Sequence, residues 1–479
     1  MLFNRFEFIL AFLPIVVLLS YLLPRSLTVL WLVLASLFFY GWSGALSFTV
    51  LEYALPLVFY SALSYGLVHL ISRSENSIHR KVLLWASLIF TVAWWLLLKL
   101  NLPEQAGLPA QTVLTVGLGF YTLRTIGYAI DVYQRRLTPV SGFQSYFLYL
   151  AFFAHLPSGP ITSAKWFFNQ LQTHLTVTAR PNWMPGFYLF SMGLLKKAIA
   201  DALGGQINPI IDAHLATGLI TSWLILLGYS AQIYLDFAGY TDMALGVGRM
   251  IGIQLPPNFA SPYLKRNPIE FWNAWHITLS HWLRDYVFTP LGRLLFSIQA
   301  LKRSPMLIAV LCYLATFILC GVWHGLSETF LLWGLYHGIG LSCCKLYGEV
   351  ARKRFPRAYH DFMFKTRMGY GFATGATFLF VALGWVFFRS HTLTQVATWF
   401  KGLLGYYGGE MRLTLVDQNL LISLGTLIIS GALIRLFQWR SDHLTYWQRV
   451  LLTANFLIVL FYYYVSANTG MTPFIYNIF

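Results

Sequence analysis

Long apolar stretches follow one another almost from the first residue of this chain. Each of the first four approaches the roughly 20 residues that a helix needs to cross the hydrocarbon core of a bilayer. They are Phe6–Leu23, Leu27–Trp42, Leu51–Ile71 and Val82–Leu100. The first lacks a small-residue cleavage site and a second follows at once, so we interpret it as a span and not as a signal peptide. The pattern predicts an all-α polytopic membrane protein.

The composition agrees with lipid as the main solvent. Of the 479 residues, 57% are hydrophobic, 18% aromatic and 10% charged, whereas a soluble domain carries about 25% charged residues. A net charge of +16 would suggest nucleic acid in a soluble protein. Here the basic residues gather in short loops between apolar stretches, which is the positive-inside pattern of multi-pass membrane proteins. We therefore expect membrane lipid, and no nucleic acid, as a partner.

The basic loops also give an orientation. They are expected at Arg73–Lys81, Arg135–Arg136, Lys196–Lys197, Lys302–Arg303 and Lys345–Arg367. Residues 101–111, between the first two, contain no Lys or Arg. Alternation of these loops places the N-terminus outside the cytoplasm. We expect a single membrane domain of about 11 to 13 transmembrane or half-crossing helices.

Two stretches are neither clean spans nor charged loops. Within His155–Arg180, the run His155–Pro160 breaks a helix amid apolar flanks, and such backbone survives at membrane depth only when protein covers it. Within Asn258–Arg293, the core Glu270–His276 mixes charge with large aromatic side chains. It predicts an amphipathic helix at the interface or folded into the mouth of the protein, and Lys265 beside it favours the cytoplasmic side.

His324 is the first candidate for chemistry. It follows the apolar run Met306–Cys320 within Gly321–Gly325, about 25 to 30 Å from Lys302 along a helix. It should therefore lie near a turn between two helices, in the outer half of the membrane, with glycines that allow close approach. An ionisable residue inside the membrane is a functional candidate by default. The alternative is a neutral histidine that ties two helices together, and position alone does not separate the two.

Further ionisable residues interrupt apolar sequence. His276 follows Trp275 in the predicted aromatic helix and should approach from the cytoplasmic side, while His281 and His337 are read mainly as structural. Asp236 and Asp242 require partners at this depth, and Arg249, on the same helical face, is a partner for Asp242. Arg284 and Asp285 are expected to form an internal pair. We found no P-loop, HExxH, dinucleotide fingerprint or GxSxG motif, and no metal-ligand spacing.

Several motifs together resemble the membrane-bound O-acyltransferase (MBOAT) family, in particular its bacterial branch that acylates alginate, peptidoglycan and teichoic acid. Trp323–Gly325 and the Glu270–His276 segment carry the resemblance first. Further matches, in order between about residues 110 and 390, are Gly119–Thr122, Tyr128–Tyr133, Ser158–Ile161, Asp236–Met243, Asn258–Gly292 and Gly384–Arg389. The chain departs from the alginate-type pattern before Gly159, which leaves the acceptor open.

The resemblance implies a ring of helices around a central tunnel. It divides the single domain into peripheral N-terminal helices (1–110), a catalytic core (111–390) and C-terminal helices (391–479). It implies that His324 is the principal catalytic histidine and His276 the second, nearer the donor. Other candidates for lining the tunnel or the substrate are Trp323, Gly325, Trp275, Asp236, Asp242, Arg284, Asp285 and Glu270.

The implied function is O-acylation of a cell-envelope glycan, peptidoglycan or an exopolysaccharide such as alginate, at the bacterial cytoplasmic (inner) membrane. No bound cofactor is expected, and the donor is acetyl-CoA or another acyl thioester in the cytoplasm. Since no serine-hydrolase pattern is found in the chain, we expect a separate extracytoplasmic SGNH-type acetyltransferase or esterase partner. The alternatives are D-alanyl transfer to teichoic acid from a carrier protein, and a transporter or scaffold without chemistry.

Overall fold

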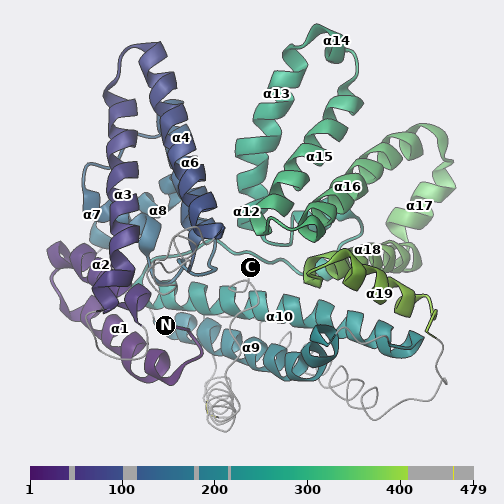
Figure 1. Cartoon of the computed structure of the whole chain (residues 1–479), viewed down its shortest axis with the longest axis horizontal. Helices are drawn as coiled ribbons and strands as arrows, with labels where there is room; N and C mark the ends of the chain where they lie inside the picture. The colour runs from purple at the N-terminus through teal and green to yellow at the C-terminus, as the bar shows by residue number, and fades with distance from the viewer. Residues whose placement is uncertain (43–48, 101–115, 177–182, 214–216, 408–456, 458–479) are drawn as a thin grey trace. The chain divides into compact units, whose positions relative to one another are not determined.

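The computed structural model describes residues 1–42, 49–100, 116–176, 183–213, 217–407 and 457 (Figure 1). All regular structure in these residues is helical, which confirms the all-α class. The chain divides into two compact units. Of the described residues, unit 1 comprises those within 1–195 and 239–256 together with residue 457, and unit 2 comprises those within 196–238 and 257–407.

Unit 1 holds the helices of the N-terminal third. They are η1 (Glu7–Phe12), α1 (Leu13–Leu22), α2 (Arg25–Gly41), α3 (Thr49–Arg73), α4 (Ser77–Lys99), α6 (Leu118–Tyr133), α7 (Phe143–Ala151) and α8 (Ala164–Thr176). Helix α3 packs against α4 and α6, and α2 packs against α3 and α7. The four apolar stretches predicted to be spans therefore form helices.

The predicted break after α7 is present and covered by protein. Residues 152–163 form no helix, and most of them, His155 among them, are buried. The buried guanidinium of Arg124 on α6 donates to the carbonyl of Leu150 at 2.9 Å. The ring of His155 lies 3.1 Å from the carbonyl of Tyr149 through Nε2. Side chains thus bind the carbonyl groups at the C-terminal end of α7, which have no hydrogen-bond partner within the helix.

Two long helices, α9 (Trp183–Asp212) and α10 (Leu219–Ile251), each contribute residues to both units. Within unit 1 their backbones meet at glycines: a Cβ added to Gly193 would lie 2.5 Å from the carbonyl oxygen of Gly239. The basic loop expected at Lys196–Lys197 is wrong. Both residues lie inside α9 and are buried, because Lys197 has carboxylate partners that a count of basic residues does not reveal.

Unit 2 contains the remaining helices. They are η2 (Pro262–Leu264), α11 (Pro268–Trp272), α12 (Ile277–Leu283), η3 (Arg284–Phe288), α13 (Thr289–Ser297), α14 (Gln299–Lys302), α15 (Pro305–His324), α16 (Glu328–Arg354), α17 (Arg357–Lys365), α18 (Arg367–Arg389) and α19 (Leu393–Leu403). Helices α15 and α16 form a hairpin, and α18 packs against α16 and α17 (Figure 1). Pro305 occupies the first turn of α15, where a missing N–H costs nothing.

Among the described residues, four helices are long and apolar enough to cross a membrane. They are Ala54–Arg73, Ser77–Lys99, Pro305–His324 and Arg367–Arg389. Two of them belong to unit 1 and two to unit 2. The expected total of 11 to 13 segments stays a prediction, since part of the C-terminal sequence lies outside the described residues.

The α15–α16 hairpin depends on glycine at its contact. A Cβ added to Gly334 on α16 would lie 2.3 Å from the carbonyl oxygen of Phe317 on α15. Replacing Gly334 with Ala is expected to destabilise the protein by about 1–3 kcal/mol, because the helices must move apart. Gly348→Ala on the same helix is the matched control, since no atom lies within 4 Å of its added Cβ. Melting temperatures in detergent would measure both, and an unchanged Gly334→Ala protein would contradict the packing.

Candidate active site

His324 is the last residue of α15, and its side chain is only 5% exposed. The chain turns at Gly325 and α16 begins at Glu328, as predicted for a residue at a helix–helix turn. Glycine is required on both sides. A Cβ on Gly321 would lie 2.3 Å from the carbonyl oxygen of Phe330, and one on Gly325 would lie 2.2 Å from the Phe330 ring.

Aromatic rings surround the His324 imidazole. The ring centroid of Phe388, near the end of α18, lies 5.1 Å away at an interplanar angle of 78°. Trp333 on α16 is 5.2 Å away, also edge-on, and the neighbouring Trp323 is 4.7 Å away. These contacts fix the orientation of the imidazole by packing.

His276 lies between α11 and α12 in the left-handed backbone region, with φ 43° and ψ 53°. The prediction that it lies on a continuous aromatic helix is therefore wrong: the segment breaks at this residue. Asn258 stabilises the break, because its Oδ1 accepts hydrogen bonds from the backbone N–H and the hydroxyl of Thr278, at 3.2 and 2.6 Å. A residue other than glycine in this conformation is uncommon and is found more often at functional sites.

The His276 side chain is 1% exposed and contacts the Phe237 ring edge-on at 4.8 Å. Trp275 beside it is equally buried. Residues 271–276, apart from Asn273, are thus buried in the protein, whereas most of residues 259–270 are partly or fully exposed. Burial lowers the pKa of His276 to about 3, since the charged form loses its hydration. The imidazole is therefore neutral at physiological pH.

A row of aromatic rings joins the surroundings of the two histidines. Trp275, next to His276, lies 5.0 Å from Trp385 on α18. Trp385 lies 5.6 Å from Phe388, which contacts His324. Trp385 is held by a hydrogen bond from its Nε1 to the hydroxyl of Tyr263, at 3.1 Å. All of these residues belong to unit 2, so the structure brings both predicted histidines into one aromatic cluster.

Asp236 on α10 is 2% exposed, and its Oδ1 lies 2.8 Å from Nζ of Lys197 on α9. Lys197 also contacts Asp201, one turn further along α9. The prediction that a carboxylate at this point needs a partner is confirmed for Asp236. The three charged residues Lys197, Asp201 and Asp236 are linked to the aromatic cluster through the chain, because Phe237 follows Asp236 and contacts His276.

Four other candidates, Glu270, Arg284, Asp285 and Asp242, take more exposed positions. Glu270 helps to form the start of α11, where its Oε1 accepts a hydrogen bond from Nδ2 of Asn267 at 3.0 Å. Arg284 and Asp285 form the predicted ion pair, with Nε and Oδ1 2.8 Å apart. The pair is not internal as predicted, because its side chains are 57% and 48% exposed. Asp242 lies on the part of α10 that belongs to unit 1.

Sequence reasoning did not propose as site residues several side chains that the structure places in the aromatic cluster, namely Trp272, Trp333, His337 and Phe388. His337 is fully buried and accepts a hydrogen bond from Trp272 through Nδ1, at 3.3 Å. One signal was available: Trp333 and His337 are four residues apart on the helix that follows His324, so they share a face.

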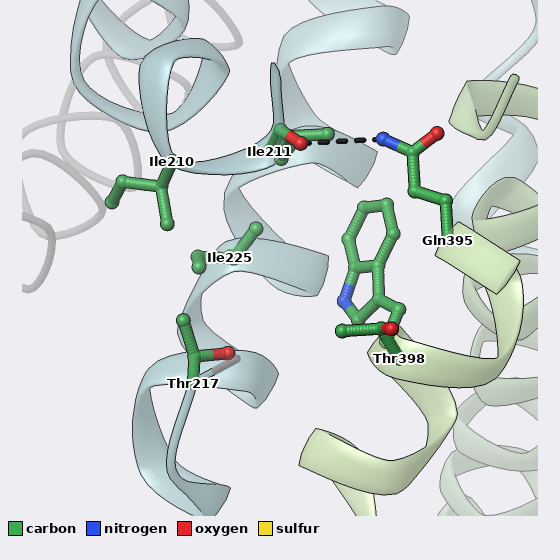
Figure 2. A pocket seen from close by; sticks show the side chains of 7 residues that line it. Ile210, Ile211, Thr217, Ile225, Gln395 and Thr398 are labelled. Carbon is green, nitrogen blue, oxygen red and sulfur yellow. Dashed lines mark hydrogen bonds between the residues drawn. The ribbon is translucent and has the colours of Figure 1, made fainter. Parts of the chain in front are cut away.

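A pocket in unit 2 lies apart from this cluster (Figure 2). It is a small pocket that opens to the surface. It is lined by Ile210, Ile211, Thr217, Ile225, Gln395, Thr398 and Trp399. Gln395 closes one side by donating from Nε2 to the carbonyl oxygen of Ile211 at 3.2 Å. Neither candidate histidine lines the pocket, so we do not assign it as the active site.

Comparison with known proteins supports the motifs. The family model for "MBOAT, membrane-bound O-acyltransferase family" matches residues 132–358. This range includes both candidate histidines, Asp236 and the aromatic residues of α11 and α16.

Individual relatives match over more of the chain. A peptidoglycan O-acetyltransferase of Helicobacter pylori is 32% identical over 85% of this chain and 80% of its own length. A probable alginate O-acetylase of Pseudomonas fluorescens is 30% identical over 92% of this chain and 83% of its own. A teichoic acid D-alanyltransferase of Bacillus subtilis is 28% identical over 53% of this chain and 65% of its own.

Proposed function

Because this chain belongs to the membrane-bound O-acyltransferase family and is a membrane O-acyltransferase, we propose that it moves an acetyl group across the bacterial cytoplasmic membrane to O-acetylate a cell-envelope glycan. The donor is a cytoplasmic thioester, acetyl-CoA. The acceptor is peptidoglycan or an exopolysaccharide. Two relatives that match over most of their length are named as O-acetylating proteins, which supports acetyl over D-alanyl.

The direction of two helices, α15 and α16, carries this proposal. Helix α15 begins just after Lys302–Arg303 and ends at His324, and its 20 residues make about 30 Å of helix. Helix α16 returns to a basic end at Arg352–Arg354. Basic residues mark the cytoplasmic ends of spans. His324 then lies about one hydrocarbon thickness away, at the extracytoplasmic end.

In this proposal His324 acts on the acceptor side. It either removes the proton from the attacking hydroxyl of the partner while that oxygen bonds to the acyl carbon and the thiolate of coenzyme A leaves, or its ring nitrogen displaces the thiolate and carries the acyl group until the hydroxyl takes it. In both routes the proton from the hydroxyl balances the thiolate, which is released as the thiol. The aromatic contacts hold the imidazole in a single orientation for either role. Trp323 and Gly325 shape its immediate surroundings.

His276 acts on the donor side. Its neutral imidazole is suited to accept or donate a hydrogen bond and not to pair with the phosphates of the donor. The row of rings from Trp275 to Phe388 presents apolar surface between the two histidines, which fits a small uncharged acyl group. A separate extracytoplasmic partner of the SGNH type takes the acyl group at the His324 end and completes transfer to the glycan.

Vesicles of opposite orientation test the proposal. Inside-out vesicles that contain the protein and enclose its extracytoplasmic partner and envelope glycan should release coenzyme A thiol from added acetyl-CoA and gain ester-linked acetate on the glycan. Right-side-out vesicles should stay near the background of vesicles without the protein, because the carrier cannot cross lipid. Equal activity in both orientations would contradict the cytoplasmic donor site. Activity with a D-alanyl carrier thioester alone would instead support the alternative that the teichoic acid relative suggests.

A further inference from the structure

His337 is a buried histidine that the proposed chemistry does not use. It lies in the middle of α16, and its side chain has no exposed surface. The Nε1–H of Trp272 donates to His337 Nδ1 at 3.3 Å. Since Nδ1 accepts this bond, the neutral imidazole carries its proton on Nε2. The bond spans 65 residues of sequence and joins α11 to α16.

The opposite edge of the His337 ring faces α18. A Cβ added to Gly384 would lie 2.9 Å from His337 Nε2, so glycine is what allows the ring to come this close. Phe380, one turn earlier on α18, contacts the ring edge-on at 5.4 Å. His337 is therefore held between α11 and α18, with its nitrogen atoms facing these two neighbours.

His337 is linked to both candidate histidines through tryptophan. Trp333, one turn before it on α16, lies 5.0 Å from the His337 ring and 5.2 Å from the His324 ring. Trp272, bound to His337 Nδ1, lies four residues before His276 and contacts Trp333 edge-on at 5.7 Å. The three rings of Trp272, Trp333 and His337 thus contact one another and occupy the space between α11 and α16.

We propose that His337 is a positioning residue for the acyl transfer: by accepting the hydrogen bond of Trp272 it fixes Trp272 and Trp333, and through them the orientation of His324 and the place of the His276 segment. The proposal rests on the proposed roles of those two histidines. It assigns no contact between His337 and substrate, so its loss should lower kcat and leave the KM for donor unchanged.

Two amide substitutions of different side-chain length, His337→Asn and His337→Gln, distinguish the roles of the two ring nitrogens. In His337→Asn the amide oxygen takes the place of Nδ1 and can still accept from Trp272, whereas in His337→Gln the amide lies where Nε2 was. We expect His337→Asn to keep kcat within about threefold. We expect His337→Gln and His337→Phe to lose about 10²-fold, because a displacement near 1 Å costs that much. The KM for acetyl-CoA, the probe used in inside-out vesicles, should stay within about twofold in all three.

Trp272→Phe provides an independent test that leaves His337 in place. It should reproduce the loss in kcat, and the double variant with His337→Phe should be no slower than either single variant, since both remove one interaction. Wild-type kcat in His337→Gln and Trp272→Phe would overturn the proposal, as would a rise in KM with kcat unchanged.

His324→Ala is assayed alongside these variants. If His324→Ala is inactive while the His337 variants are normal, only the positioning role fails. If His324→Ala is fully active, both the proposed function and the positioning role fail. His79→Asn, at an exposed position on α4, is the histidine control and should behave as wild type.

Discussion

Cells in which His324 is replaced by Ala are expected to lose the ester-linked acetate that this protein adds to the envelope. General base catalysis contributes about 10² to 10⁴ in rate, so the remaining signal should not rise above a strain without the protein. The reason is geometric as well as chemical: aromatic rings hold the His324 imidazole in one orientation, and the alanine side chain supplies no nitrogen that could accept the proton there. Acetate released from purified glycan by mild base gives the measurement.

The result requires that the His324→Ala variant be present in the membrane at the wild-type amount and be folded as the wild type is. Membrane levels and the melting temperature in detergent supply that control, and His324→Asn offers a second variant that keeps polarity near the turn. Normal acetate in a strain that produces either variant would exclude catalysis by His324. It would leave this histidine as a packing residue between α15 and α16.

Acetyl labelling of the wild-type protein distinguishes the two roles of His324. If the imidazole carries the acyl group, wild-type protein given acetyl-CoA without acceptor should show an added acetyl mass on the peptide that contains His324. If it acts only as a general base, that peptide stays unmodified while acetate still reaches the glycan in the complete system.

Replacing Lys197 with Met is expected to cost the protein about 3–5 kcal/mol of stability, because it leaves Asp236 buried without its cation. Lys197 is 1% exposed and Asp236 is 2% exposed, so solvent screens this interaction little. Asp201, a second carboxylate on the same lysine, would then face Asp236 with like charge. The measurement is the melting temperature of purified protein together with its yield in the membrane.

A double variant makes the prediction specific to charge. Lys197→Met combined with Asp236→Leu removes both buried charges, and apolar replacement of a buried pair is often neutral or stabilising. The double variant should therefore be more stable than Lys197→Met alone. Lys353→Met is the control for a lysine in an exposed ion pair, where the loss should be below about 1 kcal/mol. Equal stability of Lys197→Met and wild type would show that the pair contributes nothing.

Local patterns in the sequence predicted some of these features well. The apolar run before His324, with glycines at positions 321 and 325, correctly placed that histidine at a helix–helix turn, because length and hydrophobicity determine where such a helix ends. The Pro and Gly residues after His155 correctly predicted a buried break. The all-α class followed from composition in the same way.

Features that depend on distant partners were not predicted. Lys197 was assigned to a loop because its partner Asp236 lies on another helix, and nothing near Lys197 in sequence reveals that Asp236 is close. His337 was read as structural because its bond to Trp272 crosses 65 residues. The break at His276 depends on Asn258, 18 positions earlier, whose amide oxygen binds Thr278. Pairwise tertiary contacts, not local propensity, decide these three positions.

The row of aromatic rings between the histidines has an electrical consequence. An acetyl group that stays bonded to the thiol of its donor while it passes along Trp275, Trp385 and Phe388 would carry no charge, and these rings supply none. Membrane potential does work only on charge, about 2.3 kcal/mol per elementary charge at 100 mV. This passage would therefore be independent of the voltage, whereas the ammonium of a D-alanyl group would couple its passage to the voltage.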